Sequence, residues 1–360
     1  MTAAHAPMFD YAPPVDELTE GGDPTAGEAM SMLPSIGLEE LSDTAELLQR
    51  VDRKYLLPRA SAAHLVADLA DLGARALTID NRREFSYLSV YFDTRTLDLY
   101  RAAATGRRRR FKVRERMYLD SGLHFLELKT RGPRHLNVKD RMRLEPLGVQ
   151  KLQGAYSSAG MQHSGRVYSS AGMQHSGRPY RPSGSHQPLA VYRPADGPQM
   201  SVARDAFDTS RNALDVTRHA LDVTRHALGD HETSRWLAEM LHTRGVEHTQ
   251  ERATARVDSL IPVLNSAYRR STILQPDLSR LTIDNDLTLA PLLGNGEHVE
   301  LDDVVVETKS GGTPSVADRL LWHYGVRPIR ISKYALGVAF AFPNLPHNRW
   351  HRAMTKVEER

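Results

Sequence analysis

The sequence predicts an α+β fold in which an antiparallel, β-barrel-like sheet forms a tunnel flanked by helices. Two observations lead to this prediction. Six short segments alternate charged and apolar residues with a period of two, which is typical of strands that bury one face. Between and around them, three segments carry apolar residues at helical spacing, with capping residues near their ends.

The predicted strands carry far more Lys and Arg than acids on their charged faces. In FKVRERMY, the alternation places Lys112, Arg114 and Arg116 on one face and apolar residues on the other. The remaining segments of this kind are HFLELKTR, VKDRMRL, SAYRRST, SRLTIDND and VVVETKS, and the early strand QRVDRKYLL joins Asp52 and Lys54. Any one of them fits an ordinary half-exposed sheet, but six together favour a shared cationic surface.

Closing such a sheet with its charged faces inward gives a tunnel lined by cations, with a few carboxylates among them. Like charges in a poorly solvated space repel strongly, so a polyanion and a metal must fill the tunnel. A triphosphate with a divalent cation meets that requirement.

The overall charge agrees with an anionic partner. The net charge of the 360 residues is +3, but residues 1–49 contain ten acids and no Lys or Arg. Of the 44 acids 34 remain for the rest of the chain, against all 47 basic residues, a net charge of +13. Composition alone leaves nucleic acid, a membrane surface or a phosphorylated small molecule open.

The absence of cysteine excludes disulfides and thiolate chemistry, which fits a reducing compartment, and a cytoplasmic location is expected. The N-terminus carries no secretory signal pattern. The longest apolar stretch, Tyr334–Pro343, is half of the roughly 20 residues that a membrane-spanning helix needs.

Composition divides the chain into zones. Residues 1–46 are expected to form an acidic flexible tail, 47–353 the tunnel domain, and 354–360 a second tail. An insertion over 148–229 interrupts the domain. It contains YSSAGMQHSGR twice (156–166 and 168–178) and LDVTRHA twice (214–220 and 221–227), too few copies for a solenoid.

Three helices are predicted inside the domain. One covers 61–72, with Ser61 as N-cap and Gly73 after its end. A second starts after the N-cap Asp230, and a third starts after Thr313 and ends before Gly325.

With these segments in order, the chain resembles the VTC domain of polyphosphate polymerases, a branch of the CYTH, or triphosphate tunnel metalloenzyme, superfamily. The resemblance covers about Leu47–Pro146 and His231–Ala353. The segments that carry it are RVDRKYLL, SVYFDT, FKVRERMY, FLELKTRG, YRRSTI, RLTIDNDL, VVVETKS and ISKYALG. It implies transfer of the γ-phosphoryl group of ATP onto a growing inorganic polyphosphate chain, with release of ADP and with Mn²⁺ or Mg²⁺. The partners it implies are ATP and inorganic polyphosphate or pyrophosphate.

The resemblance also implies a set of site residues. Glu307 matches the carboxylate that holds the metal, and Arg330 stands where the eukaryotic pattern has a lysine. The residues expected to contact ATP and polyphosphate are Lys54, Arg114, Arg116, Lys129, Lys139, Tyr268, Arg270, Arg280, Arg330, Ser332 and Lys333.

Two other functions remain open at this point. A hydrolase of triphosphate or tripolyphosphate from the same superfamily would need E-x-E-x-K on its first strand, and here Val51-Asp52-Arg53-Lys54 lacks one acid. The chain could also only bind polyphosphate. No nucleic-acid partner is expected, because recognition motifs are missing, and the run 107–110 fits a solvated strand end. The transmembrane part of the eukaryotic complex is missing, so a separate membrane partner is open.

Overall fold

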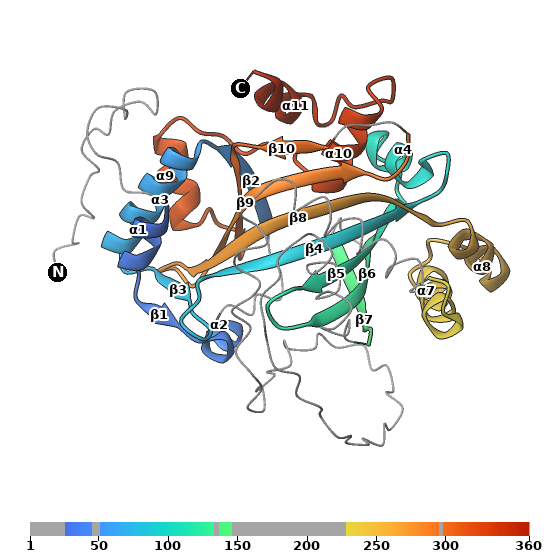
Figure 1. Cartoon of the computed structure of the whole chain (residues 1–360), viewed down its shortest axis with the longest axis horizontal. Coiled ribbons are helices and arrows are strands. Elements are labelled where there is room, and N and C mark those ends of the chain that lie inside the picture. Colours follow the sequence, from blue (N-terminus) through green and yellow to red (C-terminus); the bar gives the residue numbers. More distant parts are fainter. Residues whose placement is uncertain (1–25, 45–50, 133–136, 146–227, 295–297, 360) are drawn as a thin grey trace, which may run out of the picture.

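The computed structural model describes residues 26–44, 51–132, 137–145, 228–294 and 298–359 (Figure 1). Residues 148–227 of the predicted insertion and 1–25 of the predicted tail lie outside the described residues. Residues 26–44, which also belong to that predicted tail, form two helices and a short strand. Residues 354–358 of the second predicted tail belong to a helix, His351–Glu358, whose Met354 is buried. The other predicted domain boundaries stay a prediction.

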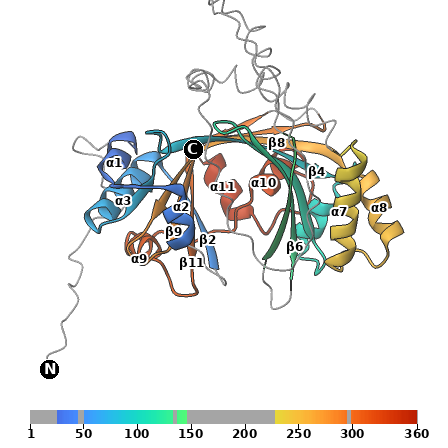
Figure 2. The same cartoon turned by 90° about the horizontal axis from the view of Figure 1, so that it is seen from below.

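A single antiparallel sheet dominates the described residues. Its main path runs β2-β11-β9-β8-β4-β5-β6-β7, and β1, β3 and β10 pair off this path, with β1 parallel to β3. The strands are β1 (Ser35–Ile36), β2 (Val51–Leu57), β3 (Arg75–Leu77), β4 (Glu84–Asp93), β5 (Phe111–Tyr118), β6 (Leu123–Arg131), β7 (Asn137–Arg143), β8 (Ile261–Leu274), β9 (Arg280–Pro291), β10 (Val299–Leu301) and β11 (Val304–Ser310). The predicted α+β class and antiparallel sheet are confirmed. The sheet bends into an arch (Figure 2), and within the described residues β2 and β7 are its unjoined ends.

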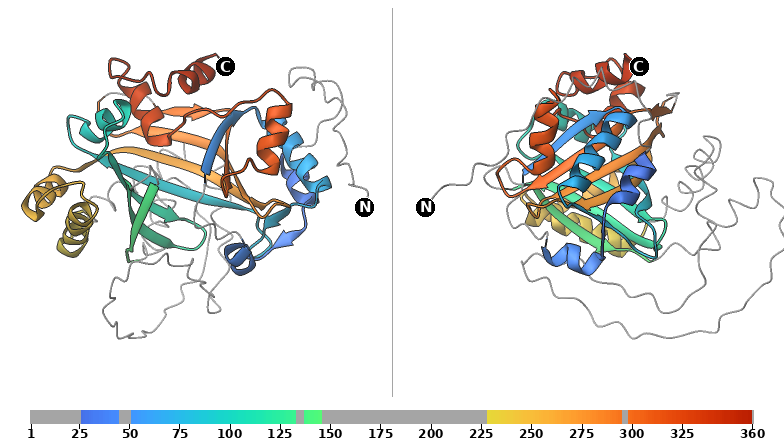
Figure 3. Two further views of the ribbon diagram at one scale, coloured as in Figure 1. Left: turned by 180° about the vertical axis from the view of Figure 1, so that it is seen from behind. Right: turned by 90° about the vertical axis from the view of Figure 1, so that its left-hand side faces the viewer.

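Helices cover both sides of this arch. They are α1 (Ala26–Met32), α2 (Leu38–Thr44), α3 (Arg59–Asp71), α4 (Asp98–Ala104), α7 (His231–Thr243), α8 (Gln250–Asp258), α9 (Val316–His323), α10 (Lys333–Ala341) and α11 (His351–Glu358). Figure 3 shows α1, α3 and α9 together at one end of the sheet and α7 and α8 at the other. Figure 2 shows α10 and α11 on the inner side of the arch. None of the described helices has the length and apolar character needed to cross a membrane.

Two hydrophobic clusters lie on the outer face of the sheet, and the alternation along the strands explains both. The apolar face of β2 and β11 (Tyr55, Val304 and Val306) packs against α3 and α9. The apolar face of β4, β5 and β6, which includes Val113 and Leu128, packs against α7 and α8. These clusters bury the outer face of the sheet, so the other face of the same strands is free to carry charge.

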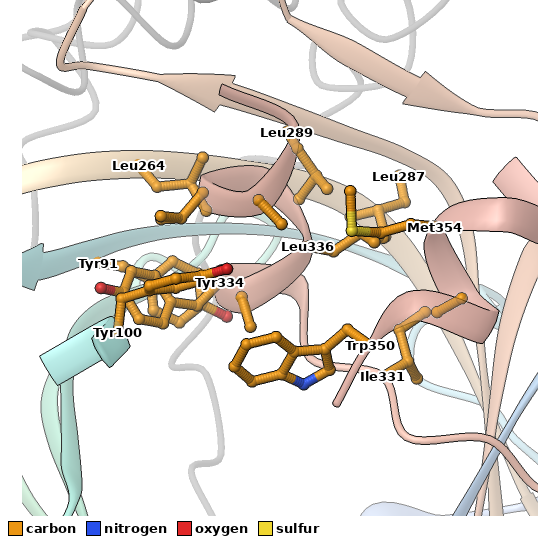
Figure 4. Packing of buried hydrophobic residues seen from close by; sticks show 14 of the residues in the cluster. Tyr91, Tyr100, Leu264, Leu287, Leu289, Ile331, Tyr334, Leu336, Trp350 and Met354 are labelled. Atoms are coloured by element: carbon orange, nitrogen blue, oxygen red, sulfur yellow. The ribbon is translucent and has the colours of Figure 1, made fainter. Parts of the chain in front are cut away.

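A third cluster lies on the inner face. Helix α10 packs there on β8 and β9, and its Tyr334 stacks on Tyr91 of β4 with ring centroids 5.3 Å apart (Figure 4). The buried Asp93 holds this arrangement, because it accepts hydrogen bonds from the Tyr334 hydroxyl and from the backbone of Leu99 and Tyr100 at the start of α4. The start of α10 is thereby fixed against the inner face.

Two predicted helix starts are wrong, by three residues for α3 and by two for α9. Helix α3 begins at Arg59, so Ser61 is inside it and makes no cap. Helix α9 has Ser315, not Thr313, as N-cap, because Ser315 and Asp318 form a reciprocal capping box in which each side chain bonds the other residue's backbone. The Asp230 cap is confirmed, with its carboxylate accepting from the Thr233 N–H at 2.9 Å.

Substituting Gly337 of α10 by alanine is expected to destabilise the protein by about 1–3 kcal/mol, through overpacking. A Cβ at this position would lie 2.6 and 2.8 Å from the two methyl carbons of the buried Leu264. This cost exceeds the gain of about 1 kcal/mol in helix propensity. Urea denaturation measures it. Leu264→Ala should cost less in the Gly337→Ala background than alone, and additive effects would contradict the contact.

Candidate functional site

The strand register places the charged residues of neighbouring strands side by side on the inner face. Lys54 of β2 is opposite Glu307 of β11, and Glu307 is opposite Thr282 of β9. At the other end, Arg114 of β5 is opposite Glu127 of β6. Directly opposed residues lie on the same face of a sheet, and Tyr91, which stacks on α10, is opposite Arg114. The charged face is therefore the one that α10 covers in part.

This face gathers almost all the site residues expected from the sequence. The strands contribute Lys54, Arg114, Arg116, Lys129, Lys139, Tyr268, Arg270, Arg280 and Glu307. Ser332 and Lys333 come from the start of α10 and reach the face. Arg330 is the exception: it is exposed in the loop before α10 and has no ion pair with a described residue.

Three buried or half-buried carboxylates organise the cations into clusters. The first is Glu127, which is 1% exposed and sits among three cations from β5 and β7. Arg114 donates to it at 2.7 Å and Lys139 at 2.8 Å, and Arg116 lies 4.0 Å away. Burial raises the pKa of Glu127, but these cations outweigh it and hold the pKa well below its usual range.

Asp284 forms the second cluster with cations from β8 and α10. Arg270 donates to both of its oxygens, at 2.5 and 2.8 Å, and the Lys333 ammonium donates to one. The same lysine lies 4.3 Å from the centre of the Tyr268 ring, and the Tyr268 hydroxyl accepts from Arg116 at 3.1 Å. The two clusters are thereby joined across β8 and β4.

Glu307 forms the third cluster. Its carboxylate lies 2.6 Å from the Lys54 ammonium and 3.5 Å from that of Lys309. Burial raises the pKa of Glu307, but Lys309, Lys54 and Arg270 bring it well below its usual range. Arg280, at the end of this cluster, donates to the carbonyl oxygen of Leu41 in α2 at 3.3 Å. Glu307 is therefore a carboxylate anion among cations.

Lys112 and Lys129 form a section of the face with little acid. They are directly opposite each other on β5 and β6, and Lys139 is opposite Lys129 on β7. Burial, followed by the charges of Arg114 and Lys54, lowers the pKa of Lys129 to about 7 against the pull of Glu307 and Glu127. The Lys129 side chain nevertheless keeps contact with solvent, so it is enclosed by protein but open to a ligand.

The site contains residues that the list from sequence lacks. Lys112 donates to the Ser332 hydroxyl at 2.6 Å, and Lys309 donates to Thr282 at 3.2 Å. The sequence signal that could have identified them is the alternation of the strands, because Lys112 stands two residues before Arg114 and Lys309 stands two residues after Glu307. Asp284 follows in the same way from the pattern Arg280, Thr282, Asp284.

A divalent metal fits this donor set only together with phosphate oxygens. In the part of the chain that the structure describes, no three His, Asp or Glu residues form a group able to hold a metal. Mg²⁺ in phosphate-binding sites needs only one or two protein carboxylates, since the substrate supplies the other oxygens. Glu307, an ionised carboxylate on the face with about 15% of its side chain exposed, meets that requirement. The assignment of Glu307 to the metal remains a prediction.

Binding of tripolyphosphate near pH 8 is expected to take up protons, and Lys129→Arg should reduce the uptake. The low pKa of Lys129, about 7, leaves it largely neutral at that pH, and a bound anion favours its charged form. The affinity of the wild type should therefore fall as the pH rises through 7 to 8, by up to about tenfold per pKa unit. Titration calorimetry in buffers of different ionisation enthalpy measures the uptake.

The arginine variant provides its own control, because the titration of tripolyphosphate itself is the same in both proteins. Lys112, whose pKa burial lowers to about 8, accounts for a smaller uptake that stays. The effect of Lys129 on stability has the opposite sign to that of a group whose charge is favoured in the folded state. The folded-state pKa of Lys129 lies below its ordinary value, so its charge disfavours folding at low pH, and this cost is relieved as the pH rises. Identical uptake in both proteins would contradict the assignment.

Comparison with known protein families gives a match over most of the chain. A family model described as the VTC domain matches residues 49–342. No curated protein sequence matches the chain.

Solved structures give weak overall similarity. A candidate adenylyl cyclase from Hippeastrum with a dominant triphosphatase activity has 13% identity and a TM-score of 0.38, over 83% of this chain and 100% of that one. A candidate adenylate cyclase from Vibrio parahaemolyticus has 10% identity and a TM-score of 0.32, over 81% and 97%. A hypothetical protein from Pyrococcus furiosus has 7% identity and a TM-score of 0.31, over 80% and 99%. Because these scores are low, the family assignment rests on the family model alone.

Proposed function

The chain belongs to the VTC-domain family, and from this premise we propose that it transfers the γ-phosphoryl group of ATP onto inorganic polyphosphate. The reaction takes place on the inner face of the sheet, with Mn²⁺ or Mg²⁺. The single observation that supports it best is the imbalance of charge on that face. Each of the carboxylates Glu127, Asp284 and Glu307 is shared by at least two cations, and Lys112 and Lys129 stand outside these clusters.

The proposed roles follow from the chemistry of the side chains. The arginines can fork onto two phosphate oxygens at once, and the lysines supply point charges. The residues proposed to bind phosphate are Lys54, Arg114, Arg116, Lys129, Lys139, Arg270, Arg280 and Lys333, to which Lys112 and Lys309 are added. Tyr268 and Ser332 place hydroxyl groups beside Arg116 and Lys112, and Arg330 belongs to the set only by its place in the sequence.

The reaction requires positioning more than acid–base chemistry. A terminal oxygen of the polyphosphate attacks the γ-phosphorus of ATP, the bond between that phosphorus and the β–γ bridging oxygen breaks, and ADP leaves. The attacking oxygen already bears a negative charge at neutral pH, so no general base is needed. Cations that neutralise the three oxygens of the transferred group and hold donor and acceptor in line are the main requirement. A metal held by Glu307 would add charge neutralisation at the phosphates of ATP.

A hydrolase would instead have to activate water. The inner face of β2 offers Asp52 and Lys54, without the second acid of an E-x-E-x-K strand within its described residues. This favours transfer to phosphate over transfer to water. The carboxylates Glu127, Asp284 and Glu307 are engaged with cations, which makes them poor bases.

One assay separates the alternatives. Purified protein is incubated with ATP and Mn²⁺, and the products are separated on a gel stained for polyanions. A ladder that grows with time supports the proposal, and release of free phosphate without a ladder would identify a hydrolase. If ATP stays unchanged and the protein nevertheless binds tripolyphosphate in a separate measurement, the protein is a polyphosphate-binding module.

A further inference from the structure

The arginine run 107–110 leads into β5 at one end of the charged inner face of the sheet, here called the cationic face. Arg110 directly precedes β5, and Arg131 is the last residue of β6. Phe111 of β5 is paired with Thr130 of β6, so Arg110 and Arg131 are the next step of the same ladder. They stand two residues beyond Lys112 and Lys129, here called the lysine row. They thus extend this row to the last residue of β6 and to the residue before β5.

A third arginine joins them from the other end of the chain. A Cβ at Gly106 would lie 2.6 Å from a guanidinium nitrogen of Arg349, so Arg349 lies directly on the backbone at Gly106. Arg110 donates to the Gly106 carbonyl oxygen at 3.2 Å, so both guanidinium groups meet at this glycine. The neighbouring Trp350 is buried against Tyr100, with ring centroids 5.4 Å apart, which anchors Arg349 (Figure 4).

The charges of Arg110 and Arg349 are poorly balanced. Each of Arg110, Arg131 and Arg349 is half-buried. Burial, and then the charges of Arg131 and Arg349, lower the pKa of Arg110, although guanidinium groups rarely lose charge. Within the described residues, Arg110 and Arg349 form no ion pair with a carboxylate, and Arg110 bonds the carbonyl oxygens of Gly106 and Arg107 instead. The clusters around Glu127, Asp284 and Glu307 are different, because each has an acid at its centre.

This difference divides the cationic face into two parts. The part with acids can accept a metal and the reacting phosphates. Within the described residues, the part without a central acid runs from Lys112 and Lys129 to Arg110 and Arg349, and a ligand that is itself a chain of anions can neutralise it. Arginine is suited to this because its planar fork bonds two phosphate oxygens and needs no metal.

We propose that Arg110 and Arg349, here called the arginine rim, bind the polyphosphate chain where it extends beyond the reacting phosphates. The proposal rests on the proposed function for the identity of the polyanion. A linear polyphosphate can contact the rim and the lysine row at once. Arg110 stands beside Lys112 at the next position of the same alternation, and Arg349 lies beside Arg110 at Gly106. A short ligand such as tripolyphosphate or ATP can contact the part with acids and the lysine row, but it does not extend to the rim.

The test compares the binding of a short and a long ligand. The double variant Arg110→Gln/Arg349→Gln should weaken binding of long-chain polyphosphate by about tenfold. Its affinity for tripolyphosphate should stay within about twofold of the wild type, since screened charges at a distance matter little. The single variants Arg110→Gln and Arg109→Gln form the matched pair: each removes one positive charge, but Arg109 contacts His248 on the α8 side, so Arg109→Gln should leave polyphosphate binding nearly unchanged. Fluorescence anisotropy with end-labelled polyphosphate, and calorimetry with tripolyphosphate, measure both.

Several results would overturn the proposal. It fails if the double variant binds long polyphosphate as the wild type does, if both ligands weaken equally, or if the wild type does not prefer the long chain. Arg110→Lys/Arg349→Lys, which keeps the charge, should restore most of the affinity, and thermal melting excludes a folding defect. Equal polyphosphate binding by both proteins, with loss of sedimentation on phosphatidylglycerol vesicles in the variant, would reassign the rim to a membrane. This test measures binding and not turnover. The rim proposal can therefore be wrong while the ATP assay still gives a ladder, and it can hold while the ATP assay gives none.

Discussion

Replacing Glu307 by glutamine is expected to lower ATP turnover by at least about 100-fold, the upper range seen when residues that only orient a metal ligand are changed. Glutamine keeps the size and the hydrogen-bonding oxygen of glutamate but removes the charge that a hard cation requires. The loss should be accompanied by weaker Mn²⁺ binding in the presence of tripolyphosphate. Steady-state assays over a range of Mn²⁺ concentrations, with electron paramagnetic resonance of free Mn²⁺, measure the two effects.

The fold should survive this change. The Lys54 side chain beside Glu307 is 30% exposed and stays solvated, and Lys309 has a pKa already lowered to about 8 by burial, so it can release its proton at little cost. Glu300→Gln, on the exposed strand β10, is the control that removes a carboxylate outside the face. Near-normal turnover of Glu307→Gln at limiting Mn²⁺ would exclude Glu307 as the metal ligand.

The inner face could be predicted from sequence because a strand has a strict period of two. The alternation in FKVRERMY determines that Arg114 and Arg116 face the same side, and the structure confirms that they do, opposite Tyr91 and Ser89 of β4. The same rule holds for Lys54, which the register places opposite Glu307. Local periodicity is enough for such statements because it depends on the backbone alone.

Contacts between distant segments could not be predicted in this way. Lys333 meets Asp284 across 49 residues of sequence, and no local pattern indicates that pair. The same holds for the folded segment 26–44. Its acidic composition suggested a tail, yet Ile36 and Leu41 are buried with Leu77 and Leu274. A few well-placed apolar residues were enough to fold it onto the end of the sheet, which an average over composition conceals.

Asp284→Asn is expected to destabilise the protein by about 3–5 kcal/mol, the range for removing one partner of a buried ion pair. The Asp284 side chain is 2% exposed and accepts from Arg270 and Lys333, whose side chains are only 14% and 12% exposed. Without the carboxylate, two poorly solvated cations face each other. Burial raises the pKa of Asp284, but the charges of Arg270 and Lys333 outweigh it and lower the pKa. The contribution of Asp284 to stability is therefore present above its ordinary pKa near 4 and is lost as the pH falls through the depressed folded-state pKa.

Urea denaturation of the two proteins at neutral pH measures the loss, and Asp286→Asn is the matched control. Asp286 lies two residues further along β9 and pairs with Arg59 and Arg269, but its side chain is 30% exposed. Its replacement should cost less than about 1 kcal/mol, as for surface ion pairs. If the face binds phosphate, tripolyphosphate should restore part of the stability of Asp284→Asn by supplying the missing negative charge, and it should stabilise this variant more than the wild type. Equal losses in the two variants would mean that Asp284 is no more essential than a surface carboxylate. A large loss that tripolyphosphate does not relieve would place Arg270 and Lys333 in the framework of the fold, outside the phosphate site.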